Sequence, residues 1–161
     1  MANLPRSFSV SAAGMYKQCP RRWKHRYVDK IPDPPGEAAL IGTFAHHVLE
    51  MLCEKDPEQR TIEEAKKIAR DTWPETENDS DFKSLNLNEA DQKEFRWKAW
   101  TAIEGLWGLE NPSEVNVLST EKKISATLSD VPFFGVIDRL DETSAGTAVT
   151  GRTALFGTSF F

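Results

Sequence analysis

The stretch Val131-Pro-Phe-Phe-Gly-Val-Ile-Asp-Arg-Leu-Asp141 predicts the middle strand of a β-meander, because β-branched and aromatic residues fill it up to a charged end. Alternate side chains of a strand share one face, so Asp138 lies with Val136 and Leu140. A carboxylate among apolar neighbours is costly unless it is paired or bound to a cation. Asp138 is therefore a candidate metal ligand, and an ion pair with Arg139 or another base is the equal alternative.

The flanking sequence extends the sheet on both sides of this strand. Alternating apolar and polar residues predict a strand over 115–128, Ser129-Asp130 predicts a hairpin turn, and a last short strand is expected at 147–150. Upstream, a period of about 3.6 predicts four helices, at residues 12–27 with a break before Pro20, 37–54, 61–73 and 89–107. The predicted fold class is α/β in the mixed α+β sense, with N-terminal helices followed by a mixed sheet.

Local signals set the expected ends of these helices. Ser11 is the expected N-cap of the first helix, and Thr61 with Glu64 matches a capping box. Pro74 is expected to stop the third helix, because proline removes a helical hydrogen bond. The acidic residues 75–88 that follow predict a surface loop.

The segment Gly42-Thr-Phe-Ala-His-His-Val-Leu-Glu50 carries a second candidate ligand, His46. On a helix, His46 lies at the border of the apolar face made by Phe44, Val48 and Met51. A border histidine can pack its ring and still present one nitrogen to a metal. Taken alone, the pattern favours a structural, hydrogen-bonded histidine over a ligand.

The segment 16–27 interleaves cations with aromatic residues. Residues 1–30 hold seven Lys or Arg against one acid, a balance of +6 in a chain of net charge −5. Such a segment suits phosphate contacts and base stacking, although a solvated surface with core aromatics is the slightly preferred alternative. The candidate DNA-binding residues are Lys17, Arg21, Arg22 and Lys24.

Length and composition limit the remaining possibilities. The 161 residues, 39% of them hydrophobic, suffice for one domain and contain no apolar run long enough to span a membrane. The absence of a secretory segment predicts a cytoplasmic location. Two cysteines, Cys19 and Cys53, are too few for a disulfide framework and are expected to be reduced thiols.

An ordered set of motifs resembles the RecB-like branch of the PD-(D/E)XK nuclease superfamily, most closely the small stand-alone exonucleases of actinobacteria and their phages. The resemblance covers about residues 7–142. The motifs that carry it are Ser9-Val-Ser11, Tyr16-Lys-Gln-Cys-Pro-Arg-Arg-Trp23, Gly42-Thr-x-x-His46-x-x-Leu-Glu50, Glu121 and Gly135-Val-Ile-Asp138-Arg.

The resemblance implies a metal-dependent DNA exonuclease-type domain, active in DNA repair, recombination or phage DNA processing. His46 and Asp138 match the positions that bind Mg²⁺ or Mn²⁺ in that family. A second acid and a lysine normally follow on the next strand. DNA is the implied partner, and the presence of a helicase or recombination partner stays open.

The sequence departs from the family after Glu142, where it contains no acid and no lysine. We therefore expect residues 1–142 to form a C-terminally incomplete nuclease domain and 143–161 an irregular tail or remnant strand, as after a deletion or a wrong gene end. Activity is expected to be impaired or absent. The alternative is a non-catalytic DNA-binding module or accessory subunit. Some relatives pair a cysteine at the position of Cys19 with three later ones to hold an iron–sulfur cluster, and the lack of those partners argues against a cluster here.

Overall fold

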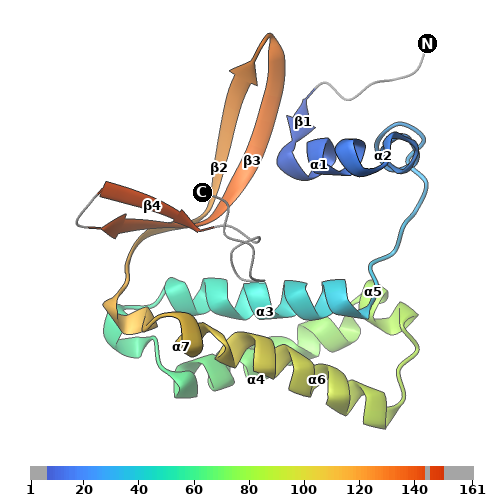
Figure 1. Ribbon diagram of the computed structural model, residues 1–161. Coiled ribbons are helices and arrows are strands. Elements are labelled where there is room, and N and C mark those ends of the chain that lie inside the picture. The colour runs from blue at the N-terminus through green and yellow to red at the C-terminus, as the bar shows by residue number, and fades with distance from the viewer. Residues whose placement is uncertain (1–6, 144–145, 151–161) are drawn as a thin grey trace. The chain divides into compact units, whose positions relative to one another are not determined.

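The structure is a computed structural model that describes residues 7–143 and 146–150. The chain divides into two compact units (Figure 1). One unit combines the N-terminal residues up to Pro34 with Lys122–Ile137, and the other combines Pro35–Glu121 with the residues from Asp138 onward. The chain therefore crosses between the units three times, once after Pro34 and twice inside the two long strands.

Helices dominate the second unit. They are α3 (Glu37–Cys53), α4 (Ile62–Asn78), α5 (Ser80–Ser84), α6 (Glu89–Glu104) and α7 (Leu106–Leu109), with short 3₁₀ turns η1 (Pro57–Gln59) and η2 (Pro112–Glu114). Figure 1 shows α3 running along α4 and α6. Val48 and Leu52 of α3 and Phe95 and Ile103 of α6 are fully buried between these helices. The apolar stripes predicted from the sequence are therefore the core of this unit.

The third predicted helix does not stop at Pro74. Thr61 caps α4 by accepting a hydrogen bond from the Glu64 N–H (3.1 Å), as the capping box predicts, but the helix continues to Asn78. Pro74 is exposed, so the Arg70 carbonyl that loses its helical partner lies at the surface. The Asn78 side chain donates to the Pro74 carbonyl (2.9 Å) and stabilises this last turn. The loop predicted over 75–88 is also wrong in part, because it contains α5 as well.

Arg60 anchors the chain just before the sheet. Its side chain is buried and donates to the carbonyl oxygens of Lys55 (2.9 Å), Pro112 (3.3 Å) and Val115 (2.7 Å). These bonds join the loop after α3 to the residues that lead into the second strand. The start of that strand is thereby fixed to the helices of the same unit.

The sheet has four strands. They are β1 (Phe8–Ser9), β2 (Asn116–Leu128), β3 (Val131–Thr143) and β4 (Gly146–Thr150). The order is β1-β3-β2, with β1 parallel to β3 and β4 antiparallel to β3 through pairs such as Asp141 with Ala148. Ser129 and Asp130 both have positive φ, which confirms the hairpin turn. The fold is the predicted mixed α+β class, although β1 was not predicted from the sequence.

The first unit has an aromatic core of its own. Its helices are α1 (Val10–Gln18) and α2 (Pro20–Tyr27), which meet at Cys19, so the predicted break before Pro20 is confirmed. Trp23 is buried and stacks on Phe8 at 6.1 Å, while Tyr16 meets it edge-on at 5.4 Å. The N-cap of α1 is Ser9 and not Ser11, because the Ser9 hydroxyl accepts from the Ala12 N–H.

Candidate metal centre

Helix α3 presents His46 and Glu50 on one side. Residues four apart on a helix are neighbours, and Ala45 and Leu49 beside them are buried. His46 itself is half-buried, at the border where the sequence predicted it. The apolar face therefore fixes the rotation of α3, and the imidazole of His46 has one accessible side.

Strand β2 supplies the partner of this imidazole. The Nε2 atom of His46 lies 2.6 Å from Oε1 of Glu121, across 75 residues of chain. Glu121 has φ of 45°, in the left-handed region that residues with a side chain rarely adopt. A backbone held there costs on the order of 1–3 kcal/mol and persists where surrounding contacts determine it. The contact with His46 is one such determinant.

His46, Glu50 and Glu121 form a cluster with the donor atoms of a metal site. Their ligand atoms all lie within 4.8 Å of one another. One imidazole and two carboxylates are donors that divalent cations accept, the carboxylates suiting Mg²⁺ or Mn²⁺ and the imidazole suiting Mn²⁺ or later metals. The residues present therefore fit a divalent cation. In the described ranges, 7–143 and 146–150, no other group of three such residues meets this spacing.

Asp138, the carboxylate predicted from the sequence, lies at the same place. It lines a small cavity of about 40 Å³ together with His46, Glu50 and Thr120. The structure thus brings the two predicted ligands, His46 and Asp138, to one cavity. Their role in binding a metal stays a prediction, and the direct contact of His46 is with Glu121.

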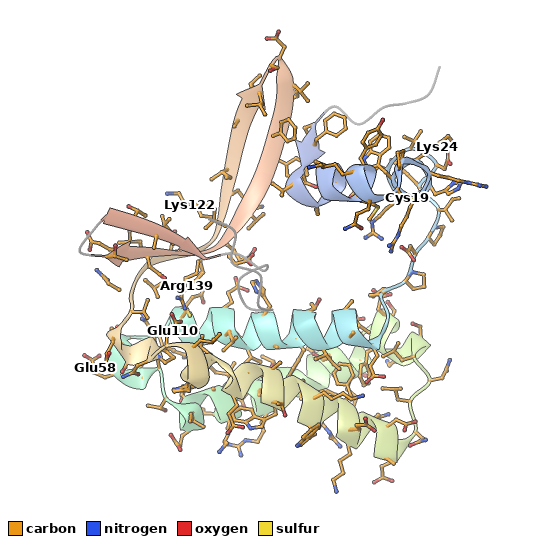
Figure 2. All side chains as sticks on the ribbon, in the orientation of Figure 1. Cys19, Lys24, Glu58, Glu110, Lys122 and Arg139 are labelled. Atoms are coloured by element: carbon orange, nitrogen blue, oxygen red, sulfur yellow. The ribbon has the colours of Figure 1, made fainter. Side chains whose placement is uncertain are left out.

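Arg139, the residue after Asp138, holds this part of β3 to the helices. Its guanidinium donates to both carboxylate oxygens of Glu110, after α7, and to Asp141 at 3.0 Å (Figure 2). Burial by itself lowers the pKa of Arg139, but the hydrogen bonds and charges of Glu110 and Asp141 outweigh it and raise that pKa. Arg139 therefore stays charged, and the register of β3 beside Asp138 is fixed.

The strand that follows carries no ionisable side chain. Strand β4 reads Gly146-Thr-Ala-Val-Thr150 and pairs with β3 from Arg139 to Thr143. Neither a carboxylate nor a lysine is therefore available from β4 at this cavity.

The basic residues of the first unit are partly neutralised. Lys24 binds Asp29 at 2.7 Å, and Arg22 lies 3.6 Å from Asp33. The hydrogen bond from Lys24, with a second from His25, lowers the pKa of Asp29. Lys17 and Arg21 are exposed, and within the described residues neither forms an ion pair. Their role in DNA binding is untested.

The two cysteines have local explanations. The thiol of Cys19 lies 3.5 Å from the Arg22 N–H and caps α2. Cys53 is buried at the end of α3, and this burial raises the pKa of its thiol. Both residues therefore have structural roles that require no metal.

A family model, the PD-(D/E)XK nuclease superfamily, matches residues 7–150. The chain belongs to this superfamily. Comparison with curated proteins and with solved structures found no match. The resemblance drawn from the sequence is thus confirmed at the level of the superfamily.

The cluster of His46, Glu50 and Glu121 fits this superfamily, because PD-(D/E)XK nucleases generally use divalent metals and act on nucleic acid. In the described part of the chain, no helix is long and apolar enough to cross a membrane.

Glu50 and Glu121 are the residues of this cluster to which the sequence analysis assigned no role. The four-residue spacing of Glu50 from His46 is a usable signal, whereas Glu121 meets His46 only through the tertiary fold.

Replacing Arg139 by methionine tests the anchor of β3. Arg139→Met leaves Glu110 and the buried Asp141 without their cation, so we expect the free energy of unfolding to fall by about 3 kcal/mol. Urea denaturation followed by circular dichroism measures it. Lys93→Met, at an exposed cation of the same unit, is the control and should change stability by less than about 0.5 kcal/mol. Equal stability of the two variants would contradict the proposed anchor.

Proposed function

We propose that this chain is a RecB-like PD-(D/E)XK domain that acts on DNA and binds one divalent cation at the cluster of His46, Glu50 and Glu121, with Asp138 of the adjoining cavity as a further ligand. The observation that carries the proposal is the 2.6 Å contact of His46 with Glu121 at the cavity lined by Asp138. The order of the motifs along the sequence supports the RecB-like assignment. Mn²⁺ suits the mixed nitrogen and oxygen donors better than Mg²⁺, which prefers oxygen.

We further propose that phosphodiester hydrolysis by this chain is strongly impaired. A bound divalent cation would offset phosphate charge and lower the pKa of a coordinated water. His46, Glu121 and Asp138 can hold the ion, but the neutral strand β4 has no side chain to orient or deprotonate that water. The proposed activity is therefore DNA binding with weak or no cleavage. Cleavage of the bound DNA is the property that distinguishes a nuclease from a non-catalytic DNA-binding module.

Mn²⁺ binding tests the proposed ligands directly. Isothermal titration with MnCl₂ should show one site in the wild-type chain and at least about tenfold weaker affinity in His46→Ala and Glu121→Gln, because each removes a donor. His47→Ala is the matched control, since this exposed imidazole lies 3.7 Å from Glu50 but is not one of the three donors of the cluster. Affinity that falls equally in His47→Ala, or in none of the variants, would remove the support for this site.

Cleavage is tested separately on linear single-stranded and double-stranded DNA with Mn²⁺ or Mg²⁺. We expect no more product than in the same reaction with EDTA, because the water-activating groups are absent from β4. Asp138→Ala distinguishes this chain's own activity from a contaminating nuclease. Robust cleavage that Asp138→Ala abolishes would show that the chain is a competent nuclease and that the proposed impairment is wrong.

A further inference from the structure

A groove crosses the second unit on the face of α3 that points away from His46. It has a volume of about 410 Å³, and its lining from α3, α4 and α6 includes Phe44, Lys66, Arg70, Trp73, Arg96 and Trp100. Phe44 and His46 are two residues apart on α3, which separates their directions by about 200°. The groove is therefore distinct from the cluster of His46, Glu50 and Glu121.

The groove is basic and aromatic at once. Nζ of Lys66 lies 5.4 Å from the ring centre of Trp100, and Cζ of Arg96 lies 5.2 Å from that of Trp73. Arg70 is a third exposed cation, and no aspartate or glutamate lines the groove. Positive charge is thus concentrated beside two tryptophan rings.

These three cations lack the carboxylate partners that their neighbours have. Lys98 on α6 binds Glu37 and Glu94 at 2.9 Å each, and Lys67 on α4 lies 3.8 Å from Glu64. Within residues 7–143 and 146–150, Lys66, Arg70 and Arg96 form no such pair. The groove therefore keeps a local positive charge on a chain whose net charge is −5.

Unpaired cations beside aromatic faces match one ligand chemistry well. Phosphates of a nucleic acid bind the cations, and unstacked bases lie on tryptophan rings, each contact stabilising the complex. The bases of a duplex are already stacked on one another, which leaves single strands as the fitting partner. An acidic protein segment would neutralise the charge but would leave the tryptophan faces without a flat partner.

We propose that this groove binds single-stranded nucleic acid. Lys66, Arg70 and Arg96 bind phosphates, and bases stack on the faces of Trp73 and Trp100 that Arg96 and Lys66 cover in the unbound chain. The binding requires no metal and uses none of the residues of the cluster, so it adds a second, separate site to the DNA binding proposed above. It also gives α4 and α6 a role that the family motifs on α3 and β3 do not include.

The test is fluorescence anisotropy of a labelled oligothymidylate of about 10 nucleotides, titrated with the full chain in EDTA. The double variant Lys66→Glu with Arg96→Glu should bind at least about tenfold more weakly. Its slope of log affinity against log salt should be smaller by about 1.4, since each lost phosphate contact removes about 0.7 for a single strand. Arg96→Gln, which removes the positive charge without adding a negative one, should show a smaller loss in the same direction.

Two variants control for general charge and for tryptophan loss. Lys93 is exposed on α6 outside the groove, so Lys93→Glu should change the affinity for the oligonucleotide by less than about twofold. Trp97 is 65% exposed and lies outside the groove, so Trp97→Ala should also have little effect. Trp100→Ala should weaken binding about fivefold or more. Thermal unfolding verifies that each variant is folded.

Three results would overturn the proposal. They are no oligothymidylate binding by the wild type, equal losses in Lys93→Glu and in the double variant, or a loss produced only by Arg21→Glu with Arg22→Glu in the first unit. A wild-type chain that binds an acidic peptide but not the oligothymidylate gives the first of these results. Since all titrations contain EDTA, failure of the Mn²⁺ site leaves this test unaffected.

Discussion

Helix α3 packs against α4 and α6 at once, and the arrangement of the second unit depends on this packing. Val48 and Leu52 are fully buried against α4 and α6, which leaves no freedom in how the helix is rotated. His46 and Glu50 are thereby held at the border of the buried face. The same rotation places Phe44 in the groove between α4 and α6. One helix therefore supplies the metal-type donors on one side and a wall of the basic, aromatic groove on the other.

The strands reach the cluster because two arginines fix them to the helices. Arg60 binds the backbone carbonyls of Pro112 in η2 and of Val115 just before β2, and Arg139 binds Glu110 from within β3. Between these anchors, Glu121 adopts its left-handed backbone and meets His46. A buried cation that loses its partners is costly, so breaking these arginine contacts should destabilise the fold more than breaking an exposed ion pair. The position of the cluster is in this sense a consequence of the anchors.

Much of this fold was predictable because its signals are local. The N-cap at Thr61, the break before Pro20 and the turn at Ser129-Asp130 each depend on a few adjacent residues, and all three are confirmed. The prediction that Pro74 stops the third helix was wrong, because an exposed proline can be accommodated inside a helix. Strand β1 is only two residues long and pairs with a strand more than a hundred residues away, so no local pattern could reveal it. For the same reason the contact of Glu121 with His46 came only from the structure, whereas His46 and Asp138 were found from motif order.

A crystal structure of the chain grown with MnCl₂, with anomalous diffraction measured near the manganese edge, tests the central claim most directly. The account predicts one strong anomalous peak within bonding distance of His46 Nε2 and of a Glu121 carboxylate oxygen, with Asp138 facing the same ion. A map in which His46 and Glu121 remain hydrogen-bonded to each other, and manganese is absent from this cavity or bound elsewhere, would contradict it.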